Sequence, residues 1–414
     1  MRGFAANVRR AVAFLLFVWG TLHAAESTPI PAAINRLGLD LYRAEAKGSE
    51  SNVLLSPYSI QTALAMVYTG ADGDTRAEMQ RVLHFPADEE VVHAGFAELA
   101  RGLKAAVGST GRIEIRMANR LFAQQGFELK SAFLATVSER YMAPLQEVDF
   151  VGAPEQVRAT MNGWVAKQTE DKIRDIVPPG IVNAKTRLAA VNAIYLKAAW
   201  QSEFSEKATK PEDFRVRGKD KVQVPTLQKQ SNFRYEKADG YTVVGLPYAG
   251  GELQFVVILP DDAGGLATIS KRLTAESLEK CAKLAPVDVI IHLPKLKLQP
   301  QLFRLSSTLQ ALGMKTAFDE PQGSADFGRM AARKPDEYPK LSEILHKAWL
   351  GLDEKGTEAA AATVVIVPPG VTARIQHSTP RPPIVVRVDH PFLFAVQHVP
   401  TGTCLFLGRV VDPR

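Results

Sequence analysis

Apolar residues recur at helical spacing through the first half of the chain. The spacing predicts helices over residues 33–46, 57–68, 75–83, 91–107, 130–141 and 154–168. A short extended segment at 52–56 leads into the second of these helices, where Pro57 stands at the favoured first helical position. Residues 113–123 break the helical pattern and fit a strand. The first half is therefore predicted to be mostly helical, with one long strand.

The second half is rich in β-branched and aromatic residues, in runs bounded by Gly, Pro or Asp. These runs predict strands over residues 188–196, 214–226, 241–246, 253–259, 287–298 and 345–352. No Gly/Ser-rich or Pro-rich linker separates the two halves, and no internal repeat is visible in the sequence. We therefore predict one large α+β domain rather than two smaller domains.

The first residues are typical of a secretory signal peptide. Arg2, Arg9 and Arg10 precede an apolar run over 11–22, and small residues follow it at the expected cleavage site. A helix of that run would span about 18 Å, too little for a hydrocarbon core of about 30 Å. We expect a signal peptide at 1–24 and a mature protein that is secreted or periplasmic, with twin-arginine export left open by the arginine pair.

Composition and charge limit the classes of partner that the sequence predicts. Hydrophobic residues make up 46% and charged residues 23% of the 414 residues, as in an ordinary globular protein. Since three of the basic residues lie in the first ten positions, the net charge of +6 gives no reason to expect nucleic acid or a membrane as a partner. Cys281 and Cys404 are too few for a disulfide scaffold or a cysteine zinc site, and a single bridge between them stays open.

Motifs of the common enzyme classes are missing. The sequence has no Gly-x-Ser-x-Gly elbow, no phosphate-binding loop, no Gly-x-Gly-x-x-Gly and no His-Glu-x-x-His. The eight His residues are scattered, without metal-ligand spacing. We therefore expect no metal and no cofactor, and a hydrolase stays only as an alternative without a motif to support it.

A stretch near the end of the chain is unusual because residues 359–373 carry no charge. Its proline-rich parts at 368–370 and 379–383 are typical of a loop. If the stretch were extended, one face would hold only small or β-branched residues, namely Thr357, Ala359, Ala361, Thr363, Val365 and Val367. That face could enter a sheet without burying a charge, and Gly356 supplies a permissive backbone before it. The pattern predicts a segment with two states, an exposed loop and an inserted strand.

This stretch closely resembles the hinge of inhibitory serpins. The matching residues are Glu354, Lys355, Gly356, Thr357, Glu358, Ala359, Ala360, Ala361 and Ala362. Other stretches resemble the same family in the same order, at 52–59, 161–165, 191–197, 246–248, 292–295, 389–392 and 408–413. The sequence is identified as a member of the serpin family, of the secreted bacterial type. The resemblance implies one serpin domain at 25–414, with a large central sheet, two smaller sheets, about eight or nine helices and an exposed reactive-centre loop at about 354–383.

The resemblance implies a protease inhibitor rather than an enzyme. A serine protease would attack the loop as a suicide substrate and form an acyl-enzyme, and the freed segment would then join the central sheet and deform the trapped protease. A non-inhibitory serpin, acting as a carrier, chaperone or plain substrate, stays the alternative. The resemblance further implies a monomer that forms loop–sheet polymers under stress.

The position of the attacked bond depends on how the loop is counted. Counting from the hinge gives the bond between Gly370 and Val371, whereas counting back from 390–392 gives a bond near 380–381, because this loop is longer than is usual in the family. We favour the hinge count, since the inserted length has to match the sheet. The candidate residues are Gly370, Val371, Thr372, Arg374 and Ile375. They favour an elastase- or subtilisin-like target over a trypsin-like one, and a cysteine protease stays open.

By the same resemblance, a polar cluster lies beneath the central sheet where its strands separate. Its members are Ser56, Ser59, Asn192 and His346. Each of them alone fits a satisfied core polar group, but together with the hinge they favour a gate for the loop. Trp200 and Phe204 are expected near the end of the sheet that the hinge enters first, although a plain core role fits them equally well.

Overall fold

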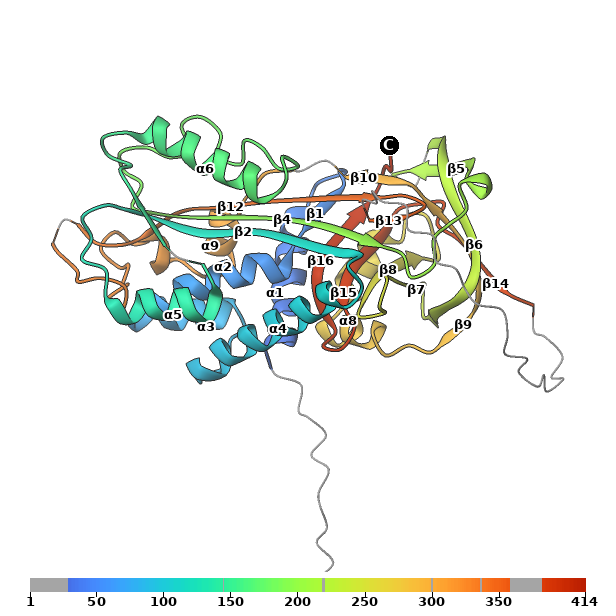
Figure 1. Cartoon of the computed structure of the whole chain (residues 1–414), viewed down its shortest axis with the longest axis horizontal. Helices are drawn as coiled ribbons and strands as arrows, with labels where there is room; N and C mark the ends of the chain where they lie inside the picture. Colours follow the sequence, from blue (N-terminus) through green and yellow to red (C-terminus); the bar gives the residue numbers. More distant parts are fainter. Residues whose placement is uncertain (1–28, 144, 218–219, 299–300, 336, 358–381) are drawn as a thin grey trace, which may run out of the picture.

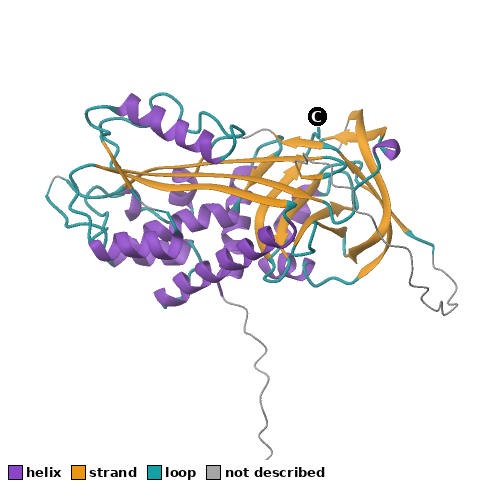
Figure 2. Ribbon diagram, viewed as in Figure 1, coloured by secondary structure: helices purple, strands orange, loops and turns teal. Residues whose placement is uncertain are grey.

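The computed structural model describes residues 29–143, 145–217, 220–298, 301–335, 337–357 and 382–414. Two sheets and the helices packed against them make up this part of the chain (Figures 1 and 2). The helices are α1 (Pro29–Ala46), α2 (Pro57–Gly70), α3 (Gly73–Val82), α4 (Glu89–Thr110), α5 (Ser131–Tyr141), α6 (Pro154–Gln168), α7 (Leu266–Arg272), α8 (Ala275–Cys281) and α9 (Leu305–Ala311). The predicted α+β class is confirmed, and nine α-helices occur among the described residues.

A seven-stranded sheet lies between two helical layers, with α6 on one face and α2 to α5 on the other (Figure 2). Its strands are β2 (Ile113–Gln124), β3 (Gln146–Val148), β4 (Leu188–Ala199), β10 (Leu296–Leu298), β11 (Phe303–Arg304), β12 (Leu341–Leu352) and β13 (Gly356–Thr357). The order is β10-β12-β13-β4-β2-β3, with β11 paired to β12. The two long strands β4 and β12 run parallel and pair directly with each other.

The second sheet has nine strands. They are β1 (Val53–Leu55), β5 (Lys210–Val216), β6 (Asp220–Ala238), β7 (Tyr241–Pro247), β8 (Leu253–Pro260), β9 (Pro286–Pro294), β14 (Ile384–Arg387), β15 (Phe392–His398) and β16 (Thr403–Val410). The long strand β6 pairs in turn with β5 over 220–226, with β9 over 226–234 and with β7 over 234–238. The two smaller sheets expected from the resemblance are therefore joined through β6 into one continuous sheet.

Two of the predicted strands are each divided in the structure. The run over 214–226 is an antiparallel pair of strands, because the chain reverses after Arg217, whose φ is +50°. The run over 287–298 forms β9 in one sheet and β10 in the other, and Lys295 between them donates its N–H to Pro225. Composition is similar on both sides of each break, so it predicts the extended conformation but not the reversal.

Helix α2 shows how the sequence places an element under the large sheet. Pro57 occupies its first turn, and the side chain of Ser56 caps the helix by accepting a hydrogen bond of 3.2 Å from the N–H of Ser59. All residues of α2 are buried, including the polar residues Ser59 and Gln61, so their side chains need hydrogen-bond partners inside the protein. The cap therefore also fixes two polar side chains in the interior, at the start of α2.

The two thiols are free and buried, so the structure holds no bridge between Cys281 and Cys404. Burial raises the pKa of both, that of Cys281 to about 12. None of the described helices is long and apolar enough to cross a membrane. The predicted signal peptide at 1–24 lies outside the described residues.

Candidate functional site

The short strand β13 lies between β12 and β4 at one end of the large sheet. Thr357 pairs with Leu352 on one side and with Ala198 on the other. Further along, β4 and β12 pair directly, Leu188–Tyr195 against Leu341–Trp349, and we call this line of direct pairing the seam. The start of the hinge therefore already occupies the position between the two strands, and the seam is closed beyond it.

The described part of the hinge is buried rather than exposed. Thr357 has no exposed surface, and Glu354 is 8% exposed. The sequence predicts an exposed loop from residue 354 onwards, so for these residues that prediction is wrong. The physical reason is tertiary, because distant segments supply the partners. Strands β12 and β4 pair with Thr357, and Lys295 and Thr209 bind the Glu354 carboxylate.

A tight turn made possible by Gly356 brings Thr357 back to β12. Asp353 donates its N–H to the carbonyl of Gly356 at 2.8 Å, and its carboxylate accepts the N–H groups of Lys355 at 2.8 Å and Gly356 at 3.2 Å. Gly356 has a φ of +154°, and a Cβ on it would lie 2.1 Å from the carbonyl oxygen of Ala198. No other residue fits this position without moving the backbone.

Aromatic residues hold the inserted end of the hinge. The hydroxyls of Thr357 and Tyr248 are hydrogen-bonded at 2.5 Å, and the Tyr248 ring stacks on Trp200 with centroids 4.7 Å apart. Trp200 donates its backbone N–H to Lys355 and its indole N–H to Asp353, both at 2.9 Å. Burial raises the pKa of Tyr248, so its hydroxyl keeps its proton.

Phe204 also contacts the hinge, since its N–H donates to the carbonyl of Glu354 at 2.8 Å. Its ring lies against Trp200 at a centroid distance of 5.9 Å. Trp200 and Phe204 are therefore placed together at the end of the sheet that holds the hinge. Tyr248 is missed by the sequence analysis as a hinge contact, because a tyrosine after a proline carries no signal of a partner more than 100 positions away.

An ion pair fixes the residue at the start of the hinge. The carboxylate of Glu354 accepts from the Lys295 ammonium at 2.9 Å and from the Thr209 hydroxyl at 2.8 Å. Burial alone would raise the pKa of Glu354, but the bonds from Lys295 and Thr209 outweigh it and hold the pKa below its ordinary value. The carboxylate is therefore charged at neutral pH and anchors the turn to two other segments.

The predicted polar cluster comes together under the seam, and all four of its side chains have no exposed surface. Asn192 of β4 and His346 of β12 are directly paired in register. The amide of Asn192 donates to the Ser59 hydroxyl at 2.6 Å, and its oxygen contacts Nδ1 of His346. Ser56 donates its N–H to Nε2 of His346 at 3.1 Å. The cluster therefore ties helix α2 to both strands of the seam.

The protonation of His346 follows from these contacts. A backbone N–H is always a donor, so Nε2 must be the acceptor and the proton of the neutral ring lies on Nδ1. Burial lowers the pKa of His346 to about 3. The sequence analysis misses one further member of the network, Asn119 of β2, whose side-chain oxygen accepts from Ser59 at 3.0 Å and from Asn192 at 2.5 Å.

The outer face of the seam is covered by the segment that follows α6. Lys347 of β12 donates to the carbonyls of Arg174 at 3.1 Å and Asp175 at 3.0 Å. The rings of Tyr195 on β4 and Trp349 on β12 contact each other across the seam, with centroids 5.7 Å apart. Separation of the two strands therefore has to break contacts on both faces of the sheet.

The remaining sites predicted from the sequence lie outside the described residues. These are the hinge residues Glu358, Ala359, Ala360, Ala361 and Ala362 and the bond candidates Gly370, Val371, Thr372, Arg374 and Ile375. Within the described ranges, no group of three or more His, Cys, Asp or Glu side chains could hold a metal ion.

Comparisons with known proteins agree with one another. A family model described as "Serpin (serine protease inhibitor)" matches residues 32–413. The leukocyte elastase inhibitor of Bos taurus is 37% identical over 395 residues, which cover 93% of this chain and 99% of that protein. Serpin B6 of Macaca fascicularis is 37% identical over 383 residues, which cover 91% and 97%. The crystal structure of Serpin48 from the insect Tenebrio molitor, described as a highly specific serpin, superposes with a TM-score of 0.79 at 29% identity and covers 94% of this chain and 100% of its own. The chain belongs to the serpin family of serine protease inhibitors.

Proposed function

We propose that this serpin is a secreted suicide inhibitor of elastase- or subtilisin-like serine proteases. The observation that carries the proposal is the position of Thr357, which lies between β12 and β4 as the last residue of β13, a strand that the following sequence can continue. Residues 358–367 are small or β-branched apart from Glu358, so they fit a position between two buried strands.

The inhibitory cycle begins with attack by the protease serine on a loop carbonyl. The peptide bond breaks, an acyl ester joins the protease to the new C-terminus, and the released amine becomes the N-terminus of the C-terminal fragment. The acylated segment then extends β13 along the seam. This requires β4 and β12 to separate, so the contact between His346 and Asn192 is lost and the inserted strand pairs with both neighbours.

Backbone pairing supplies most of the driving force. Each new ladder hydrogen bond contributes about 1 kcal/mol net, and burial of small apolar groups adds about 25 cal/mol per Å². Insertion of a dozen residues would then release on the order of 10 kcal/mol, comparable to the whole stability of an ordinary domain. A free energy of this size is available to deform the tethered protease.

The proposed target class rests on the residues near the attacked bond. We propose cleavage between Gly370 and Val371, where small and β-branched residues suit a shallow specificity pocket. A trypsin-like protease would instead use Arg374. The name of the Bos taurus relative, leukocyte elastase inhibitor, supports the first choice.

Secretion is proposed from residues 1–24, which carry the three parts of a signal peptide. Expression of the full chain in the producing cell should yield an exported protein that begins near Ala25. Retention in the cytoplasm with residues 1–24 still attached would overturn this part of the proposal.

One experiment tests the inhibitory function. The mature protein is mixed with elastase, subtilisin and trypsin in turn, and each mixture is run on a denaturing gel. The mass of the released C-terminal fragment is measured by mass spectrometry. We expect a covalent complex with elastase or subtilisin and a fragment of residues 371–414. Cleaved protein without any complex would instead identify a non-inhibitory serpin, and a fragment that begins at Ile375 would identify Arg374 as the attacked residue.

A further inference from the structure

The segment that joins β4 to β5, residues 200–209, makes four hydrogen bonds to the buried start of the hinge. Two of them come from Trp200, one from Phe204 and one from Thr209. Between Trp200 and Phe204 the chain bends at residues 201–203, which are exposed, and we call these three residues the bend. The position of the bend therefore determines whether Trp200 and Phe204 can bind the hinge at the same time.

A cavity of about 320 Å³ lies between the bend and β6. Its walls include Gln201 and Ser202 of the bend and Ser231 and Asn232 of β6. Protein interiors are normally closely packed, so this gap means that side-chain packing alone does not hold the bend against β6. Polar contacts have to supply the connection.

Lys229 of β6 supplies it. Its ammonium donates to the Ser202 carbonyl at 2.7 Å, to the Ser202 hydroxyl at 2.6 Å and to the Glu203 carbonyl at 2.6 Å. An ammonium has three N–H donors, so each of them has an acceptor. Nζ of Lys229 also lies 5.7 Å from the centroid of the Phe204 ring. Among the residues that the structure describes, these are all of the hydrogen bonds between the bend and β6.

The electrostatics show that Lys229 holds the backbone of the bend rather than a charge partner. Burial lowers the pKa of Lys229, and the nearby Glu203 carboxylate acts in the opposite direction. That carboxylate is itself bonded to Arg112 at 2.6 Å. A partly desolvated ammonium needs acceptors in place of water, so the three bonds fix the side chain in one geometry. Its backbone is fixed as well, because Lys229 pairs with Ile291 of β9.

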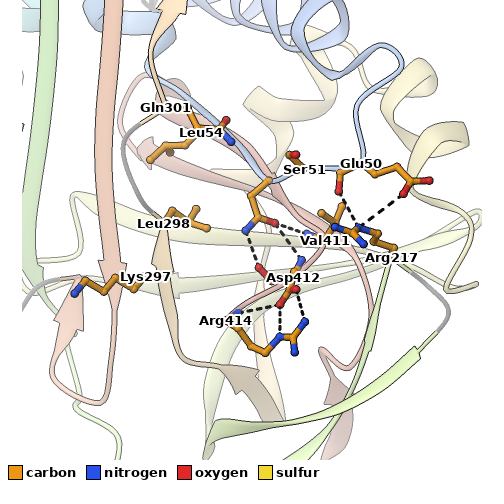
Figure 3. A pocket seen from close by; sticks show the side chains of 11 residues that line it. Glu50, Ser51, Leu54, Arg217, Lys297, Leu298, Gln301, Val411, Asp412 and Arg414 are labelled. Atoms are coloured by element: carbon orange, nitrogen blue, oxygen red, sulfur yellow. Dashed lines mark hydrogen bonds and ion pairs between the residues drawn. The ribbon is translucent and has the colours of Figure 1, made fainter. Parts of the chain in front are cut away.

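A larger cavity, of about 510 Å³ beside β10, has walls that are joined differently (Figure 3). Several side chains connect them: Asn52 accepts the N–H of Asp412 at 3.1 Å, and Arg217 donates to the Glu50 carbonyl at 3.4 Å. Loss of one of these side chains leaves the contacts of the other in place. Loss of Lys229 removes all three of its bonds to the bend at once.

We propose that Lys229 is a positioning residue for inhibition, because it holds the bend where Trp200 and Phe204 can both bind the hinge. The proposal rests on the proposed function. With the hinge held, insertion continues from Thr357, which is already paired with β12 and β4. Without Lys229, the first hinge residues have to be ordered again before insertion, which costs conformational entropy and slows it. Because insertion competes with hydrolysis of the acyl ester, more protease then escapes and leaves cleaved inhibitor.

Hydrogen–deuterium exchange of the intact protein, read by mass spectrometry, measures the positioning directly. In Lys229→Met, which keeps an apolar stem but no donor, we expect the amides of 200–204 and 353–357 to exchange severalfold faster and those of β15 and β16 to stay unchanged. Lys229→Arg keeps the charge and several donors and should stay close to the wild type. Lys237→Met is the matched control, since Lys237 lies on the same strand in a surface ion pair with Asp261, and it should change neither segment.

Equal exchange in the wild type and Lys229→Met would overturn the positioning role, and so would an increase of the same size in β15 and β16. If Lys229→Met does not fold, Ser202→Ala takes its place, because it removes one acceptor of Lys229 at an exposed position. Faster exchange over 200–204 is expected there as well, and an unchanged rate would overturn the role.

The effect on inhibition is measured as the number of inhibitor molecules consumed per trapped elastase. This number should rise severalfold in Lys229→Met and return close to the wild-type value in Lys229→Arg. A merely structural role would lower the thermal unfolding midpoint without changing the number, so an unchanged number would overturn the role in inhibition. A wild-type protein that traps no protease would overturn the proposed function instead, whereas the exchange measurement needs no protease and decides the positioning separately.

Discussion

The imidazole of His346 donates its Nδ1 proton to the side-chain oxygen of Asn192, across the line on which β12 and β4 pair. This contact joins the two strands that have to part when the loop inserts. Because the ring is fully buried and neutral, its protonation at low pH should lower the free energy of unfolding. On the other side of the ring, Nε2 accepts a hydrogen bond from the backbone N–H of Ser56. A second proton on Nε2 would therefore find no acceptor.

Acidification should loosen the seam through His346. The folded-state pKa is about 3 against an ordinary value of 6.5, so the unfolded or opened state binds more protons between these values and stability is lost as pH falls below about 6.5. At about 1.4 kcal/mol per pH unit, the loss from this group at pH 5 is about 2 kcal/mol. Thermal unfolding of the wild type and His346→Asn at pH 7 and pH 5 measures it.

The variant removes the titrating ring, so the drop between the two pH values should be smaller than in the wild type. The comparison also cancels His398, whose pKa burial lowers to about 4 and which remains in both proteins. Equal drops in the two proteins would contradict the assignment of a neutral, buried His346.

Replacement of Gly356 should expel the start of the hinge. In Gly356→Ala the new Cβ would meet the Ala198 carbonyl, and the backbone would have to leave a φ of +154°, a strain of about 1–3 kcal/mol. We expect Thr357 to leave the sheet, which limited proteolysis near residue 357 would detect as faster cleavage. Gly108→Ala is the matched control, because Gly108 lies in helix α4 with nothing within 4 Å of its Cβ position. Equal cleavage of both variants would contradict this account of Gly356.

Replacement of either residue of the ion pair between Lys295 and Glu354 should destabilise the protein, but by different amounts. Lys295→Met leaves the buried carboxylate of Glu354 with only the Thr209 hydroxyl, whereas Glu354→Gln leaves a partly exposed ammonium that water can solvate. We expect Lys295→Met to lower the free energy of unfolding by about 2 kcal/mol and Glu354→Gln by about half as much. Denaturant unfolding of both single variants and the double variant provides the comparison. A larger loss in Glu354→Gln would show that the carboxylate is not buried against Lys295.

A charge at position 357 should turn the inhibitor into a substrate. Thr357→Arg would place a guanidinium where the native side chain has no exposed surface and bonds to Tyr248, so entry of the hinge into the sheet should be impeded. The measured quantity is the number of inhibitor molecules consumed per trapped elastase, which should rise severalfold. Thr357→Ser keeps the hydroxyl and is the control. If Thr357→Arg consumed no more inhibitor than the control, insertion through this position would be refuted.

The hinge could be located from its local chemistry, whereas the polar cluster was expected only from the resemblance to the serpin family. A helix start at Pro57 and a permissive glycine at 356 are set by the backbone of the residue itself. The contacts of Asn119 and Tyr248 could not be found in this way, because each joins segments far apart in the chain and neither residue differs locally from an ordinary polar or aromatic residue. Burial of Thr357 was missed for the same reason, since it depends on the register of two distant strands.

The central claim is that the native fold holds back an insertion that would make it more stable. The direct measurement is the thermal unfolding midpoint of the intact protein and of the same protein after cleavage in the loop by a protease that it does not trap. We predict that the cleaved form unfolds about 10 °C higher or more, as a gain on the order of 10 kcal/mol requires. A cleaved form that unfolds at the same temperature as the intact protein, or below it, would contradict the account.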